Sequence, residues 1–267
     1  MDNVDIVRQY YDDNVQDEWN RLERHIAEFG ITRRVLAQHI RPGDRVLDMG
    51  GGPGRYSLHL AGQGCDVTLA DLSPGNVAFA AGKAEEAALP LRTLCADARN
   101  PAELEGESFD HVLLMGPLYH LTQEEDRRQA VRACLNLLRP GGTLFAAFIS
   151  SNAATWDLYS RYPTLVLQPD QRKFLDLLVQ DLPYTGHSFT QSFFIRPADV
   201  LPFFAPFPLE KLHLVGCESF LALRDLELAA QPPEVRDAWL DVAAEVCERQ
   251  DLLSMSEHIL YVGRKLQ

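Results

Sequence analysis

The chain has 267 residues, of which 46% are hydrophobic and 24% are charged, values typical of a globular protein with a buried core. This length allows one large domain, or a core domain with a substantial appendage. The formal net charge of −13 disfavours DNA or RNA as a partner, because neutralisation of phosphates supplies most non-specific affinity for nucleic acid. No run rich in lysine and arginine offsets that charge.

The N-terminus and the cysteines favour a cytoplasmic protein. Residues 1–14, MDNVDIVRQYYDDN, carry scattered charges and no apolar run, so we expect no secretory signal. No segment has the roughly 18 uninterrupted apolar residues that a membrane helix needs, so we expect no membrane partner. The five cysteines are widely spaced and lack a C-x-x-C pair, which predicts buried thiols in a reducing compartment. No histidine motif for a metal is present, and we predict no metal site.

The first predicted elements lead into a glycine-rich turn. Over residues 16–37, apolar residues that include Trp19, Leu22 and Ile26 recur at helical steps, which predicts an amphipathic helix. The turn RPGD then introduces a strand over residues 45–48. The next elements are predicted, in order, as a helix at 55–61, a strand ending at Asp71, a helix at 73–88, and strands at 91–97 and 109–116.

The following helix and strand complete the alternating pattern. Thr122 and Glu125 form a T-x-x-E capping box that predicts the start of this helix. RPGG ends the helix before a strand over residues 143–150. Strands that alternate with helices at such short intervals predict a parallel, doubly wound α/β sheet, covered on both faces, over about 41–150.

The pattern changes after Ser150. Residues 151–199 are rich in proline and aromatic residues and show no regular alternation, apart from a helix near 171–182. Two further strands are predicted near 209–219 and 258–264, with a helical stretch between them. We therefore expect an inserted cap before a final pair of sheet strands.

The glycine-rich turn is the first candidate binding site. Gly50, Gly52 and Gly54 follow the first strand, where backbone N–H groups and a helix N-terminus can approach a ligand. The G-x-x-x-x-G-K-[ST] pattern of a phosphate-binding loop is absent. Arg55 stands where a dinucleotide fingerprint has its third glycine, which makes a nicotinamide cofactor less favoured. A turn that binds nothing remains the alternative.

Two carboxylates narrow the choice of ligand. Asp71 closes the second strand, where an acidic side chain can accept from both hydroxyls of a ribose. Asp97 closes the third strand at the same edge of the sheet. Two acids lining this crevice would repel pyrophosphate. They suit a ligand that has a ribose, an exocyclic amine and a positive charge.

These segments resemble the class I S-adenosylmethionine-dependent methyltransferases. VLDMGGGPGRY is similar to their first motif, VTLADLS to the second-strand acid, CADAR to the adenine-contacting motif, and LLRPGGTLFAAF to the segment entering the fifth strand. The resemblance covers about residues 9–150. YYDDNVQDEWNRLERH and MGPLYHL further resemble a small-molecule subgroup, distantly like the quinone-biosynthesis C-methyltransferases.

The resemblance implies a Rossmann-like, seven-stranded and mainly parallel sheet with an N-terminal helical lid and an inserted cap. The expected divisions are a lid at 1–40, the S-adenosyl-L-methionine-binding core at 41–150, a substrate cap at 151–205, and final sheet strands with a helix at 206–267. The implied cofactor contacts are Gly50, Gly52, Gly54, Asp48, Met115 and Gly116 for the methionine and ribose portions, Asp71 for the ribose hydroxyls, and Leu72, Asp97 and Ala98 for the adenine.

A sulfonium is already an activated methyl donor, so the protein must chiefly align an acceptor and exclude water. His120 lies just after the fourth strand, where it is a candidate general base with an ordinary pKa near 6.5; the alternative is a structural hydrogen bond. Tyr119 either lines the acceptor pocket or packs in the core. Tyr11 either covers the sulfonium through a cation–π contact or packs in the core. Arg21 either meets a cofactor carboxylate or faces water.

The function expected from these residues is methylation of a small molecule at oxygen, nitrogen or carbon. An RNA or protein acceptor is the first alternative. The others are a nicotinamide-dependent oxidoreductase on a similar sheet, which Arg55 disfavours, and a non-catalytic nucleoside-binding protein.

Overall fold

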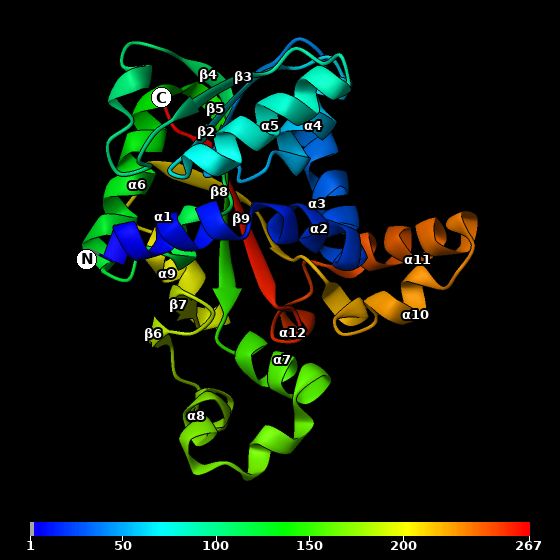
Figure 1. The fold of residues 1–267 in the computed structure, drawn as a ribbon. Coiled ribbons are helices and arrows are strands. Elements are labelled where there is room, and N and C mark those ends of the chain that lie inside the picture. The colour runs from blue at the N-terminus through cyan, green and yellow to red at the C-terminus, as the bar shows by residue number, and fades with distance from the viewer. Residues whose placement is uncertain (1–2) are drawn as a thin grey trace.

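The computed structural model describes residues 3–267, which form a mostly parallel sheet with helices on both faces (Figure 1). The strands are β1 (Arg45–Met49), β2 (Asp66–Asp71), β3 (Arg92–Cys95), β4 (Phe109–Leu114), β5 (Leu138–Ser150), β6 (Tyr184–His187), β7 (Gln191–Ile195), β8 (Leu209–Gly216) and β9 (His258–Lys265). The helices are α1 (Asn3–Asp13), α2 (Val15–Arg24), α3 (Ile26–His39), α4 (Arg55–Gly62), α5 (Pro74–Glu86), α6 (Glu124–Leu137), α7 (Ala153–Arg161), α8 (Arg172–Gln180), α9 (Val200–Phe204), α10 (Asp225–Ala229), α11 (Pro233–Val246) and α12 (Gln250–Leu253).

The sheet contains the seven strands expected from the sequence and one additional hairpin. Strands β3, β2, β1, β4 and β5 are parallel neighbours in that order. Strand β9 pairs antiparallel with β5, and β8 pairs antiparallel with β9, which is the predicted final pair. The hairpin of β6 and β7 joins the far end of β5, where Ile149 pairs with Phe194. The predicted α/β class with a mainly parallel sheet is therefore confirmed.

Both faces of the sheet are buried, which explains why its strands read as nearly continuous apolar runs. Along β1, Val46 packs on the face covered by α3, α4 and α11, whereas Leu47 packs on the opposite face, against α6. On β5, Phe145 packs on the same face as Val46, and Leu144 packs on the same face as Leu47. This alternation follows from the period of two in a strand. Within residues 3–267, no helix combines the length and the apolar character needed to cross a bilayer.

The predicted helix over residues 16–37 consists of two helices. Helix α2 ends at Arg24 and α3 begins at Ile26, and the intervening His25 leaves helical geometry with φ −97° and ψ 68°. Helix α1 precedes them and is fixed by Asp12, whose carboxylate accepts from the Ser73 hydroxyl at 2.5 Å and the Gly75 backbone at 3.0 Å. The side chain of Asp12 thus joins the first helix to the start of α5.

The inserted residues 151–205, predicted from the sequence as a substrate cap, form α7, α8, α9 and the hairpin of β6 and β7. Helices α7 and α8 project beyond the end of β5, away from α1 and α2 (Figure 1). The hairpin of β6 and β7 approaches the N-terminal helices through Phe189, whose ring centroid lies 5.8 Å from that of Tyr10. Arg161, at the end of α7, lies close enough to His25 for its charge to lower the pKa of that histidine. Helices α1 and α2 cover the carboxyl edge of the sheet, because their residues line the same cavity as the ends of β1, β2 and β4.

Candidate active site

The turn after β1 brings two backbone segments into close contact. Gly50 has φ +75° and Gly52 has φ +57°, a region that side chains other than glycine rarely adopt. A Cβ atom on Gly50 would lie 2.4 Å from the ring of Pro117, and one on Gly116 would lie 2.8 Å from the Gly50 carbonyl oxygen. The residues after β1 and β4 therefore form a bare backbone edge that a ligand can approach closely.

One cavity opens beside this edge. Its empty space amounts to about 1240 Å³, including the solvent at its mouth. The residues predicted as sites that line it are Tyr11, Asp48, Gly50, Gly52, Asp71, Leu72, Asp97, Ala98, Met115, Gly116, Tyr119 and His120. Gly54 is the exception: its φ of +92° and a distance of 3.0 Å from a Cβ at this position to that of Ala80 give it a packing role under the turn.

Asp71 organises the middle of the cavity. One carboxylate oxygen accepts from the Gly52 backbone at 2.8 Å, and the other accepts from the Ser73 backbone at 2.9 Å and the Asn76 amide at 3.2 Å. Burial raises the pKa of Asp71 and outweighs these hydrogen bonds, which lower it. Within the described residues, the buried Oδ1 of Asn76 has no partner, although Asn76 lines the cavity. A ribose hydroxyl fits this oxygen as a donor, so these residues suit a nucleoside.

The other two predicted acids have protein partners. Asp48 is buried and accepts from the Ser57 hydroxyl at 2.7 Å, and burial raises its pKa to about 6. It thereby ties the end of β1 to α4. Asp97 is half-buried and bonds Arg99 through both carboxylate oxygens. Burial would raise the pKa of Asp97, but the Arg99 contacts outweigh it and lower the pKa. An adenine amine would therefore meet an ionised carboxylate here.

Tyr11 and His120 are joined across the cavity. The Nδ1 of His120 lies 3.1 Å from the Gln191 carbonyl oxygen, which can only accept, so this nitrogen carries the proton. The Tyr11 hydroxyl, 2.6 Å from Nε2, then donates to the free lone pair. Burial lowers the pKa of His120 to about 4 and raises the pKa of Tyr11, so both rings are neutral near pH 7.

Sequence reasoning missed a polar group that also lines the cavity. Arg21, for which the sequence left open a cofactor carboxylate or water as the partner, turns inward and donates to Glu28, a residue that the sequence did not single out, at 2.6 Å. Glu28 in turn lies 3.7 Å from Nδ1 of His258, the first residue of β9. Glu28 was detectable as an acid within an otherwise apolar helix face. His258 gave no signal, because its partners Glu218 and Glu28 lie 40 and 230 residues away along the chain.

The sheet order, the glycine turn, the strand-end acid and the shared cavity together define a Rossmann-like α/β protein with a cavity at the carboxyl edge of its sheet. Residues 46–142 match a family described as "Methyltransferase domain". These residues therefore form a methyltransferase domain, as the resemblance implied.

The curated relatives act on different atoms. The chain is 29% identical, over 65% of each protein, to the ubiquinone biosynthesis O-methyltransferase of Cronobacter sakazakii. It is 37% identical to the glycine/sarcosine N-methyltransferase of Parasynechococcus marenigrum, over 53% of this chain and 51% of the relative. The chain thus spans about half to two thirds of the length of these relatives. The quinone-biosynthesis relative is an O-methyltransferase, whereas the sequence suggested C-methyltransferases.

A solved structure extends the comparison to nearly the whole fold. The 1,6-didemethyltoxoflavin-N1-methyltransferase of Burkholderia thailandensis, with bound 1,6-didemethyltoxoflavin and S-adenosylhomocysteine, has a TM-score of 0.60 and 17% identity. The match covers 98% of this chain and 88% of that chain. At this identity the likeness supports the fold.

Proposed function

We propose that the chain transfers the methyl group of S-adenosyl-L-methionine to a small-molecule acceptor. The observation that carries the proposal is that one cavity runs past Asp71, Gly50 and Gly116 and is also lined by Tyr119 and His120. It offers a nucleoside-binding part and an aromatic part in one space. The cover provided by α1 and α2 favours a small acceptor over an RNA or protein chain.

The residues would hold the two reactants in line. The cofactor supplies an activated methyl group on its sulfonium. Asp71 and the free oxygen of Asn76 would bind the ribose hydroxyls, and Asp97 would accept from the adenine amine. Gly50 and Gly116 would let the methionine portion lie against the backbone. Alignment and exclusion of water then account for most of the rate.

A proton must leave an oxygen or nitrogen acceptor, and we propose that His120 accepts it at Nε2. Because burial lowers its pKa to about 4, the ring is neutral and its lone pair is available near pH 7. The Tyr11 hydroxyl occupies that lone pair at 2.6 Å. The acceptor would therefore replace Tyr11 at Nε2, which couples acceptor binding to a shift of α1.

Calorimetry with the full chain tests the cofactor, and labelled methyl transfer to pooled small metabolites tests the activity. We expect S-adenosylmethionine and S-adenosylhomocysteine to bind and NADH not to bind. The pool should yield a labelled product that disappears when Asp71 is replaced by alanine. Tight NADH binding, or no binding of either adenosyl compound, contradicts the proposal.

A further inference from the structure

A second polar group lines the same cavity and has no role in holding the cofactor under the function proposed above. These residues come from α2, α3, α4, the segment after β8, and the start of β9. They are Arg21, Glu28, Thr32, Tyr56, Cys217 and His258, called here the polar wall. His258 is the member whose geometry is most constrained.

Two carboxylates and the backbone fix the ring of His258. Its Nδ1 lies 2.7 Å from Oε1 of Glu218 and 3.7 Å from Oε2 of Glu28. The other oxygen of Glu218 accepts from the backbone N–H groups of Glu257 and His258, at 3.0 Å each. Glu218 is buried, with 1% of its surface exposed, so its position leaves the ring little freedom.

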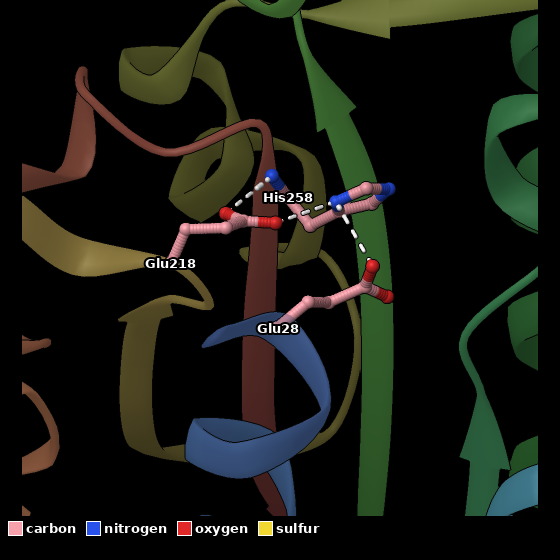
Figure 2. A group of neighbouring side chains, drawn as sticks. All are labelled: Glu28, Glu218 and His258. Carbon is pink, nitrogen blue, oxygen red and sulfur yellow. Dashed lines mark hydrogen bonds and ion pairs between the residues drawn. The ribbon is translucent and has the colours of Figure 1, made fainter. Parts of the chain in front are cut away.

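The second ring nitrogen, Nε2, is on the opposite side of the ring. Figure 2 shows it on the side of the ring opposite Glu218, and the dashed lines to both carboxylates begin at Nδ1. Among residues 3–267, no side chain or backbone group forms a hydrogen bond with this atom, and His258 lines the cavity. A ring nitrogen whose orientation is fixed and which has no protein partner is free to bind a molecule in the cavity.

The surrounding charges keep both ring nitrogens protonated. Burial alone would lower the pKa of His258, but the carboxylates of Glu28 and Glu218 outweigh it and raise the pKa to about 9. Burial would raise the pKa of Glu28, but Arg21 and His258 lower it to about 2. The other titratable groups that interact with this cluster include His25, Tyr56, Tyr119, Cys217, Asp225 and Glu257. Near pH 7, Nε2 is therefore a charged N–H donor.

Neighbouring rings connect His258 with the residues proposed to bind the acceptor. The ring centroids of Tyr119 and His258 are 6.4 Å apart, and those of Tyr119 and His120 are 4.7 Å apart. The Tyr119 hydroxyl lies 4.0 Å from the position of a Cβ on Gly116, at the cofactor edge. Tyr119 thus lies between the proposed base and the imidazolium, and an acceptor against it can reach both.

A metal ion would need the same ligand atoms. One oxygen or nitrogen from each of Glu28, Glu218 and His258 lies within 4.8 Å of the others. However, Glu28 already accepts two hydrogen bonds from Arg21, and Nδ1 of His258 donates to Glu218. A cation would have to displace that proton beside a guanidinium, so the arrangement favours an imidazolium.

We propose that His258 binds the methyl acceptor, its Nε2–H donating to an anionic oxygen such as a carboxylate or phenolate, and that Glu218 positions the ring. Charge-assisted hydrogen bonds of this kind are roughly twice as strong as neutral ones. The acceptor class is therefore a small molecule that carries an oxyanion near its methylated atom.

Binding of matched probes to the S-adenosylhomocysteine complex tests the proposal. Calorimetry or NMR compares benzoate with benzamide and acetate with acetamide, which differ in charge but little in shape. We expect at least one anion to bind roughly tenfold or more tightly than its amide, and His258→Gln to remove that preference. No preference for either anion, no binding of either, or a preference that survives His258→Gln overturns the proposal.

An NMR titration of His258 tests the role of Glu218. It does not depend on the His258→Gln variant, which could fail to fold. We expect the ring to titrate near pH 9, to shift when benzoate or acetate binds, and to titrate at lower pH in Glu218→Gln. Glu248→Gln is the control, because Glu248 also contacts a histidine at 2.7 Å but is exposed. An unchanged titration in Glu218→Gln, or stoichiometric metal that Glu218→Gln removes, overturns the proposal.

Affinity for S-adenosylhomocysteine separates this proposal from the proposed function. If the unmodified chain does not bind S-adenosylhomocysteine, the proposed function is wrong. If the chain binds S-adenosylhomocysteine but shows no preference for either anion over its amide, only the role assigned to His258 is wrong.

Discussion

Replacing Glu218 by glutamine should remove much of the pH dependence that His258 gives to folding. The pKa of His258 rises from 6.5 to about 9 on folding. Since one pKa unit corresponds to about 1.36 kcal/mol, the protonated ring stabilises the fold by on the order of 3 kcal/mol. A raised histidine pKa gives stability that is fully present below pH 6.5 and is lost as pH rises through about 9.

The measurement is urea unfolding at several pH values between about 6 and about 9.5, which covers the window set by the two pKa values. The free-energy difference between the wild type and Glu218→Gln should be largest near pH 6 and should shrink as pH rises. Part of the effect remains, because Glu28 still faces the ring. Glu248→Gln, which alters the exposed pair with His213, should change stability by less than about 1 kcal/mol. A difference for Glu218→Gln that is constant over the whole range refutes the reasoning.

Three further changes test the cofactor edge and the base. Asp71→Ala should weaken S-adenosylmethionine binding, measured by calorimetry, roughly ten- to a hundredfold, because hydrogen bonds to a charged group contribute about 1.5–3 kcal/mol each. Unchanged affinity in a folded variant would show that Asp71 does not bind the cofactor. His120→Ala should slow methyl transfer by roughly 10²–10⁴-fold at unchanged cofactor affinity, and the wild-type rate should fall only as the pH approaches about 4; a full rate in the variant means alignment alone suffices. Gly50→Ala should lower both the unfolding temperature and cofactor affinity more than Gly43→Ala. Both glycines have positive φ, but a Cβ at position 50 would collide with the ring of Pro117, whereas one at position 43 would meet nothing within 4 Å. Equal losses in the two variants would exclude that collision as the cause.

The sheet could be predicted because its strands are buried on both faces and end at recognisable turns. The runs before Gly50 and at Asp71 set the first strands within a residue or two. Three local features of the structure differ from the sequence prediction. The expected capping box is absent: α6 begins at Glu124 after Gln123, and the Thr122 hydroxyl accepts from Asn3 instead. The break at His25 and the hairpin after α8 depend on contacts with distant segments, which no local pattern records.

Some residues of the candidate site could likewise be predicted from the sequence, and others could not. Asp71 and Gly50 were predictable, because each lies in a motif whose spacing fixes its place at the edge of the sheet. The group of Glu28, Glu218 and His258 was not, because it joins α3, the segment after β8 and the start of β9 only when the sheet has formed. A single acid on an otherwise apolar helix face does not reveal which distant partner makes its burial favourable.

The contact between His120 and the hairpin has a consequence for how the inserted segment can vary. The partner of Nδ1 is the backbone carbonyl of Gln191, which every amino acid possesses. Replacing the side chain at position 191 therefore leaves this contact available. Adding or deleting one residue in β7 does not, because successive carbonyls along a strand point to opposite sides. The length and pairing of the hairpin, rather than its composition, determine the tautomer of the histidine.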